Sequence, residues 1–231
     1  MGETGRLIAL VPCAGTGSRA GAVQPKQYQS VAGRPLVEHT LAALAAVQRI
    51  GRVLVVVAPQ DAQLSATAHW EVARCGGTTR AESVCNGLQH LLAHGAHASD
   101  WVLVHDAARC LVTPALVNAL IDACLPDAVG GLLALPLPDT LKVARAGRAV
   151  QTLERSDKWL AQTPQMFRLG PLLSALEPHR AAGFAGMTDE AGAMELAGHA
   201  PLLVPGSLLN LKVTWPQDFA LAEAILKGQA T

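Results

Sequence analysis

The chain has 231 residues, half of them hydrophobic, which is enough for one α/β domain with a sizeable core. Its 18 acidic and 18 basic residues give a formal net charge of zero, which argues against a general binder of nucleic acid or membrane surfaces, since such proteins usually carry a basic excess. The five cysteines form no C-x-x-C pair, and neither a signal peptide nor an apolar stretch of roughly 20 residues is evident, so we expect a cytoplasmic protein with reduced thiols.

Short apolar runs alternate with helical patterns along most of the chain. In chain order, the pattern predicts a strand at residues 7–11, a helix at 36–47, a strand at 52–58, a helix at 81–93, a strand at 101–105, a helix at 114–124 and a strand at 131–135. Continuously apolar strands that alternate with helices are typical of a parallel sheet with helices on both faces. Ligands of such sheets bind beyond the carboxyl ends of the strands, which singles out the loops after Val11 and Val104.

The pattern changes between residues 138 and 160. Two segments, 140–144 and 149–153, flank a glycine-containing turn and predict a β-hairpin. Because a hairpin with little apolar content is marginal alone, we interpret it as an arm that packs on a second subunit; the alternative is a surface flap on a monomer. The α/β pattern then returns with a helix near 188–197, a strand near 202–204 and a last helix from residue 216. We therefore expect one domain, residues 1–231, with an inserted dimerisation arm at about 138–160.

A glycine-rich loop follows the first predicted strand. Gly15 and Gly17 permit unusual backbone dihedrals, so the loop amides can point at phosphate oxygens. Arg19 and Lys26 add two cations of different geometry. The glycine spacing is one residue too long for the G-x-G-x-x-G of dinucleotide-binding folds, and the G-K-[ST] ending of a P-loop is absent. The G-x-G-x-R…P-K arrangement is instead similar to the signature loop of sugar-phosphate nucleotidyltransferases.

The third predicted strand runs directly into V-H-D-A-A-R at residues 104–109. The Asp106 carboxylate would face the glycine-rich loop across the top of the sheet. If that loop binds phosphates, an intervening Mg²⁺ would relieve the repulsion between the carboxylate and the phosphates. Taken alone, a strand-end aspartate is more simply a capping or turn residue. His105 is interpreted as structural, because a phosphate nucleophile is already ionised and needs no histidine base.

Further polar motifs are dispersed along the chain, and each alone would be an ordinary loop. They are G-G-T-T-R-A-E-S at 76–83, P-D-T at 138–140, Arg155, Q-T-P-Q at 162–165, M-T-D-E-A at 187–191 and N-L-K-V-T at 210–214. Together with the first two motifs, in order and in spacing, they resemble the 2-C-methyl-D-erythritol 4-phosphate cytidylyltransferase family of the non-mevalonate isoprenoid pathway (MEP pathway). The resemblance runs from about residue 7 to about residue 222.

The resemblance implies a Rossmann-like nucleotidyltransferase fold with a mostly parallel central sheet, helices on both faces and a protruding β-hairpin arm. It implies transfer of CMP from CTP to 2-C-methyl-D-erythritol 4-phosphate, giving 4-diphosphocytidyl-2-C-methyl-D-erythritol and pyrophosphate. Mg²⁺ would be the cofactor, and the protein would be a homodimer with shared active sites and with no nucleic-acid or membrane partner. Since charge accumulates on the α-phosphate and on pyrophosphate, catalysis there needs positioned cations.

Carried over residue by residue, the resemblance also implies which side chains do this work. The catalytic cations would be Arg19, Lys26, Arg155 and Lys212. The nucleotide would be bound by Pro12, Ala14, Gly15, Gly17, Gly77, Arg80, Ser83, Asp106 and Ala107, with Asp106 also as the metal ligand. The polyol phosphate would meet Arg109, Thr140, Arg155, Thr163, Thr188, Asp189 and Lys212. Thr140 and Arg155, on the exchanged arm, would reach the partner's site.

Some positions depart from the family pattern. Cys110 stands where relatives often have Pro, and Leu209 stands where relatives often have an acid, so only Asp106 is assigned to the metal. Trp215 has no functional account. The alternatives are a cytidylyltransferase for another polyol phosphate, such as ribitol 5-phosphate, and a non-catalytic nucleotide-binding module. The length leaves no room for the cyclase domain fused to some relatives, so we expect a single activity.

Overall fold

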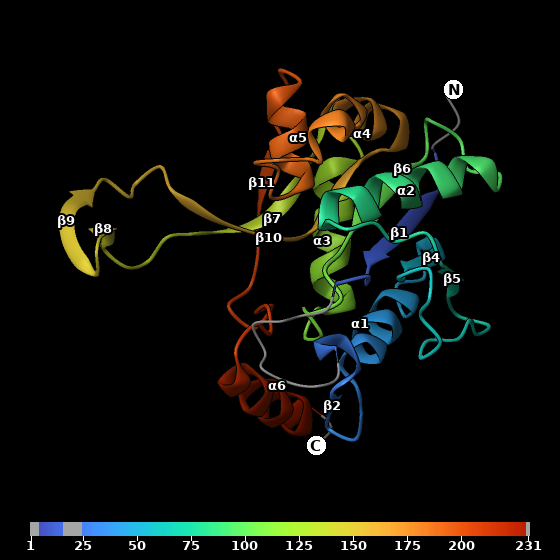
Figure 1. Cartoon of the computed structure of the whole chain (residues 1–231), viewed down its shortest axis with the longest axis horizontal. Coiled ribbons are helices and arrows are strands. Elements are labelled where there is room, and N and C mark those ends of the chain that lie inside the picture. The colour runs from blue at the N-terminus through green and yellow to red at the C-terminus, as the bar shows by residue number, and fades with distance from the viewer. Residues whose placement is uncertain (1–4, 16–24, 230–231) are drawn as a thin grey trace.

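The computed structural model describes residues 5–15 and 25–229, and its centre is a seven-stranded sheet (Figure 1). The strands are β1 (Leu7–Pro12), β4 (Ile50–Val56), β5 (Glu71–Ala73), β6 (Trp101–Val104), β7 (Gly130–Pro136), β10 (Trp159–Arg168) and β11 (Leu202–Pro205). Their order across the sheet is β11-β7-β10-β6-β1-β4-β5. Neighbours pair in parallel, except that β10 is antiparallel to both β6 and β7. The prediction of a mostly parallel sheet is therefore confirmed.

Helices cover both faces of this sheet. The first face carries α1 (Leu36–Ala45) and α3 (Pro114–Cys124), and the second carries α2 (Arg80–Ala93), α4 (Leu169–Leu176) and α5 (Glu190–Leu196). Alternate residues of β1 divide between the two cores: Leu7, Ala9 and Val11 join the first, and Ile8 and Leu10 join the second. Burial on both sides is the reason that the strands are continuously apolar in the sequence.

The remaining elements lie beside the sheet. A short helix η2 (Lys26–Tyr28) and a small hairpin, β2 (Ser30–Val31) with β3 (Arg34–Pro35), follow the glycine-rich loop, and η3 (Glu177–Ala182) continues α4. The last helix, α6 (Pro216–Gln229), packs in a third apolar cluster with Val31, Leu111 and Val213. Within the described residues, no helix has the length and apolar character needed to cross a membrane.

The predicted hairpin is present as β8 (Leu141–Arg145) and β9 (Arg148–Leu153), and it projects away from the body of the molecule (Figure 1). The two turn residues have positive φ angles, 47° at Ala146 and 75° at Gly147. Positive φ at both central residues is the geometry of the type I′ turn, whose twist matches that of the flanking strands. Glycine adopts this conformation without strain, so Gly147 supports the turn.

The sequence pattern did not predict β5, α4 or β10. Strand β10 matters most, because it contains the T-P-Q motif and inserts between β6 and β7. Its Gln162, Thr163 and Gln165 are buried, each with hydrogen bonds to distant parts of the chain. Polar residues that are satisfied by remote partners leave no alternating or continuous apolar pattern along the strand.

A buried carboxylate joins the starts of β1 and β6. Asp100 accepts hydrogen bonds from the backbone amides of Arg6, at 2.9 Å, and His97, at 2.8 Å, and from the Arg6 guanidinium, at 2.8 Å. Burial alone raises the pKa of Asp100, but these hydrogen bonds outweigh it and hold the pKa below its ordinary value.

We predict that Asp100→Asn lowers the free energy of unfolding at neutral pH by about 2 kcal/mol, because a buried charge-assisted network loses its negative charge and one of its two acceptor oxygens. A carboxylate with a lowered folded pKa stabilises above its unfolded pKa of about 3.9, so this stabilisation should fade as pH falls through the lower folded pKa. Urea titrations at several pH values measure both effects. Asp122→Asn, which breaks the exposed pair with Arg49, should change the free energy by less than about 0.5 kcal/mol; equal losses in the two variants would contradict the prediction.

Candidate active site

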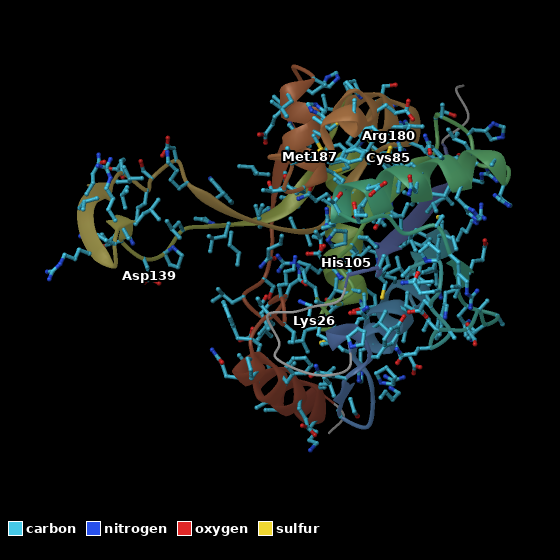
Figure 2. The ribbon with its side chains drawn as sticks, viewed as in Figure 1. Lys26, Cys85, His105, Asp139, Arg180 and Met187 are labelled. Atoms are coloured by element: carbon cyan, nitrogen blue, oxygen red, sulfur yellow. The ribbon has the colours of Figure 1, made fainter. Side chains whose placement is uncertain are left out.

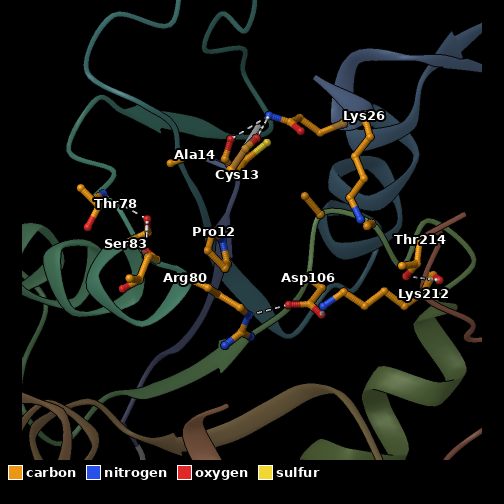
Figure 3. Close-up of a pocket in the computed structure, with 16 residues that line it drawn as sticks. Pro12, Cys13, Ala14, Lys26, Thr78, Arg80, Ser83, Asp106, Lys212 and Thr214 are labelled. Atoms are coloured by element: carbon orange, nitrogen blue, oxygen red, sulfur yellow. Dashed lines mark hydrogen bonds and ion pairs between the residues drawn. The ribbon is translucent and has the colours of Figure 1, made fainter. Parts of the chain in front are cut away.

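A cavity of about 300 Å³ opens at the carboxyl edge of the sheet (Figure 3). Four segments line it: residues 12–15 after β1, residues 77–83 at the start of α2, residues 106–108 after β6, and Lys212 with Thr214 before α6. Lys26 and Gln27 complete the lining among the described residues. The two loops that the sequence singled out, after Val11 and Val104, therefore meet in space.

The loop after β1 is fixed by Gln27. Its side-chain amide donates to the carbonyl oxygens of Cys13, at 3.3 Å, and Gly15, at 2.8 Å, and the side chain is itself buried. A Cβ added to Gly15 would meet nothing within 4 Å, so this glycine borders open space. Of the residues predicted in this loop, Pro12, Ala14 and Gly15 line the cavity, whereas Gly17 and Arg19 lie outside the described residues.

The start of α2 forms a second wall. The N-cap Thr79 accepts from the backbone amide of Glu82, and the Glu82 carboxylate accepts from the amide and hydroxyl of Thr78. Ser83 accepts from the Gly77 amide at 3.1 Å and donates to the Thr79 carbonyl at 2.9 Å. These capping contacts hold residues 77–79 tightly against the helix. The predicted nucleotide residues Gly77 and Ser83 therefore lie at the cavity in a rigid turn.

Asp106 is the electrostatic centre of the site. One oxygen, Oδ1, accepts from Arg80 Nε at 2.7 Å, the other, Oδ2, lies 2.7 Å from Lys212 Nζ, and Arg109 Nε is 4.0 Å from Oδ2. Figure 3 shows Arg80 and Lys212 approaching this carboxylate from opposite sides. Burial raises the pKa of Asp106, but the charges of Arg80 and Lys212 outweigh burial and hold that pKa far below its ordinary value. The group is therefore ionised at neutral pH.

Lys26 reaches the same cavity from helix η2. Its ammonium group donates to the Val213 carbonyl at 2.9 Å, which places it beside the segment that carries Lys212. Two of the four predicted catalytic cations, Lys26 and Lys212, are thus brought together. Arg155, the third, lies on the exposed arm with its guanidinium bonded to the Pro138 carbonyl.

A second cavity, of about 230 Å³, lies next to the first and shares Arg80, Asp106 and Lys212 with it. Its lining includes five residues predicted to meet the polyol phosphate: the shared Lys212 and also Arg109, Thr163, Thr188 and Asp189. Arg109 is almost completely buried, and it donates to the Asn210 carbonyl at 2.6 Å. Asp189 is the N-cap of α5, accepting from Gly192 N at 3.0 Å, and it also accepts from Gln165 at 2.9 Å.

Thr140 and Arg155 do not line either cavity of their own chain. Both are exposed and belong to the arm. Figure 2 shows Asp139, the neighbour of Thr140, far from Lys26 and His105 in the body. A role for Thr140 and Arg155 at an active site therefore stays a prediction.

The buried His105 sets the backbone at Asp106. Its Nε2 donates to the Arg109 carbonyl at 3.2 Å, so Nδ1 is the acceptor for the Thr163 hydroxyl at 3.1 Å, and that hydroxyl accepts from the Asp106 amide at 3.0 Å. Burial lowers the pKa of His105 to about 4, so the ring is neutral at physiological pH. This arrangement agrees with the structural role expected for His105.

Glu190 is a site residue that the sequence did not reveal. It is the first residue of α5, is 1% exposed and pairs with Arg80 through both carboxylate oxygens, at 2.7 and 3.0 Å. It lies within the M-T-D-E-A motif, but an acid in the first turn after an N-cap is already accounted for by helix capping, so no site role was assigned to it. Burial raises the pKa of Glu190, and the Arg80 charge opposes that rise.

Among the described residues, no group of three metal-ligating side chains is close enough to hold an ion by itself. Asp106 is the one carboxylate among the described lining of the first cavity. Mg²⁺ is commonly held by one or two carboxylates together with substrate phosphates, so a single carboxylate on the wall of this cavity fits that ion.

We predict that Thr163→Val destabilises the fold by about 1–3 kcal/mol, because the Asp106 amide and His105 Nδ1 both lose their partner in a buried setting. Thr163→Ser keeps the hydroxyl and is the matched control. Urea unfolding of the two variants should show the larger loss of unfolding free energy for Thr163→Val. A larger loss for Thr163→Ser would exclude a stabilising role for the Thr163 hydroxyl between Asp106 and His105.

The family model described as 2-C-methyl-D-erythritol 4-phosphate cytidylyltransferase matches residues 7–228. A 2-C-methyl-D-erythritol 4-phosphate cytidylyltransferase of Paraburkholderia phymatum is 54% identical over 230 residues, which cover 96% of this chain and 97% of that protein. The bifunctional enzyme IspD/IspF of Albidiferax ferrireducens is 65% identical over 232 residues, covering 99% of this chain, which spans about half (54%) of that enzyme.

Solved structures agree with the sequence relatives. The crystal structure of a 4-diphosphocytidyl-2C-methyl-D-erythritol synthase superposes with a TM-score of 0.84 at 39% identity, covering 96% of this chain and 98% of the other. The fold, the order of the motifs and the cavities at the sheet edge agree with these relatives. The chain belongs to the 2-C-methyl-D-erythritol 4-phosphate cytidylyltransferase family.

Proposed function

We propose that this chain transfers CMP from CTP to 2-C-methyl-D-erythritol 4-phosphate and releases pyrophosphate, in the cytoplasm, as a step of isoprenoid precursor biosynthesis. The observation that supports this most is the pair of adjacent cavities with a common wall of Arg80, Asp106 and Lys212. A transfer between two phosphorylated substrates needs two neighbouring sites whose reacting groups meet at one set of charges.

In the proposed reaction, a phosphate oxygen of the polyol phosphate attacks the α-phosphorus of CTP. A new P–O bond forms as the bond to the bridging oxygen breaks, and the electron pair leaves with pyrophosphate. The attacking oxygen is already ionised, so no general base is required. This suits a site whose one histidine at the carboxylate, His105, is buried, neutral and committed to two hydrogen bonds.

The cations supply the electrostatic part of the mechanism. Lys26 and Lys212 line the first cavity, where they would neutralise charge on the α-phosphate and on the departing pyrophosphate. Lys212 also lines the second cavity, so it can hold the incoming phosphate against the α-phosphorus. Arg19, beyond the described residues, stays a prediction for the same role.

Enzymes of this type use a divalent cation, and we propose Mg²⁺ here. Asp106 and the nucleotide phosphates would hold it, and the ion would supply charge neutralisation at the phosphate oxygens. Asp106 itself would also orient the nucleotide, because Arg80 and Lys212 hold its carboxylate in the wall common to both cavities.

We further propose a homodimer in which each arm reaches the partner's site. The arm and its base expose apolar side chains, with Val150 52%, Trp159 39% and Leu160 46% exposed. An isolated two-stranded hairpin is marginal in water, so its apolar side chains need a partner surface. Thr140 and Arg155 lie outside their own chain's cavities, as an exchanged arm requires.

The substrate assay is the direct test. Pyrophosphate release from CTP should be faster with 2-C-methyl-D-erythritol 4-phosphate than with ribitol 5-phosphate, by a kcat/KM ratio on the order of tenfold to 100-fold. The reverse preference would assign the chain to another polyol phosphate. Binding of CTP without pyrophosphate release from either polyol phosphate would make it a non-catalytic binding module.

The shared site is tested by mixing two inactive chains. Lys26→Ala should lower turnover by about 100- to 1,000-fold, as for loss of one transition-state contact, and Arg155→Ala should act on the partner's site. Refolded at equal amounts, half of the dimers are hybrids with one intact site of two, so about a quarter of wild-type turnover should return.

A mixture of Lys26→Ala with Lys212→Ala is the control for this experiment. Both substitutions lie in the body of the chain, so every site in the hybrid carries one of them and no activity should return. Equal, negligible activity in the two mixtures, with hybrid dimers shown to form, would exclude an exchanged arm.

A further inference from the structure

Glu190 is a carboxylate placed in the interior beside the two cavities but outside their linings. Both of its oxygens are bonded to Arg80, at Nη1 and Nη2, while Nε of the same guanidinium is bonded to Asp106. Arg80 therefore bridges two carboxylates, one on α5 and one at the end of β6. A guanidinium held by three such bonds has a fixed plane and a fixed position.

The backbone on both sides of Glu190 is held by hydrogen bonds. The N-cap Asp189 bonds to Gly192 within α5 and to Gln165 on β10, and Gln165 in turn accepts from the Ala191 amide at 2.7 Å. The first turn of α5 is thus attached to the central sheet on both sides of Glu190. Displacement of that carboxylate would require breaking several buried hydrogen bonds.

A role in packing alone does not account for this arrangement. A buried ion pair gives little net stability, and apolar residues of the same volume usually serve the fold as well or better. What the pair does provide is geometry: a chain of contacts runs from Glu190 through Arg80 to Asp106 and on to Lys212, across the wall common to both cavities.

We infer that Glu190 is a positioning residue, which fixes Arg80 so that Asp106 and Lys212 stay aligned toward the ligands of both cavities. The inference rests on the proposed function for the identity of those ligands. A positioning role and a simple charge effect predict opposite results when Glu190 is neutralised. Removing one negative charge beside a phosphate site would by itself favour anion binding, whereas loss of alignment would weaken anion binding.

The test compares Glu190→Gln with Glu195→Gln, the same chemical change at an exposed position of the same helix. Under conditions where each variant is fully folded, Glu190→Gln should lower kcat/KM for both substrates by about tenfold to 100-fold, the scale of a misaligned site. Glu195→Gln should stay within about twofold of wild type. Wild-type kcat/KM, or tighter CTP binding, in a folded Glu190→Gln protein would overturn the inference.

A double-mutant cycle separates positioning from a merely structural role. If Glu190 acts through Arg80, adding Glu190→Gln to Arg80→Gln should change kcat/KM by less than about twofold, because the contact is already lost. If the fold-losses in kcat/KM of the two single variants instead multiply in the double variant, Glu190 acts independently of Arg80, and the proposed chain of contacts is excluded.

A second variant and a binding measurement complete the experiment. If Glu190→Gln does not fold, Glu190→Asp retains the charge but withdraws it by one methylene, and wild-type kcat/KM in that variant would contradict the inference. Equilibrium titration with CTP is run alongside turnover. Absence of turnover in the wild-type chain counts against the proposed function, whereas equal CTP affinity in wild type and Glu190→Gln counts against the role of Glu190.

Discussion

The ionised carboxylate of Asp106, almost enclosed by protein, is the constraint around which the site is organised. An unpaired charge in that position would be strongly destabilising, so cations have to converge on it. They come from separate parts of the chain: Arg80 from the start of α2, and Lys212 from the segment that precedes α6. Their attraction to one buried anion brings the second half of the chain against the first at the carboxyl edge of the sheet. The same cations line both cavities, where the phosphates of the proposed substrates would meet them.

The position of Asp106 depends in turn on β10, which runs antiparallel to both of its neighbours in the central sheet. Because β10 inserts beside β6, its Thr163 lies next to the residues that follow β6 and can bond to both the Asp106 amide and His105. The same strand carries Gln165, which holds the first turn of α5. A parallel strand in that place would run the other way and would present its carboxyl end, with different side chains, at this edge. The reversal of β10 therefore links the cavity predicted to bind the nucleotide to the cavity predicted to bind the polyol phosphate.

The sequence predicted those parts of the molecule whose signal is local. Continuous apolar runs marked the strands that are buried on both faces, and the glycine at the turn marked the hairpin. The two loops at the sheet edge followed from the strands and from the known preference of ligands for that edge. Strand β10 was missed because its buried polar residues are satisfied by groups 24 to 58 positions away in the sequence. Glu190 was missed for the same reason: its partner Arg80 is 110 positions distant, and helix capping already explained an acid at that place.

Charge distribution explains how a protein with no net charge can bind two anionic substrates. A formal charge of zero gives no long-range attraction for a triphosphate, so affinity has to come from cations placed within a few ångströms of it. In the described part of the site, the cations Lys26, Arg80, Arg109 and Lys212 lie near three carboxylates: Asp106 and Glu190 are bonded to Arg80, and Asp189 caps α5. Arg80 is paired with both Asp106 and Glu190, and Lys212 is paired with Asp106. We propose that Arg80 sets the geometry and that Lys26 and Lys212 would supply the positive potential where negative charge develops during transfer.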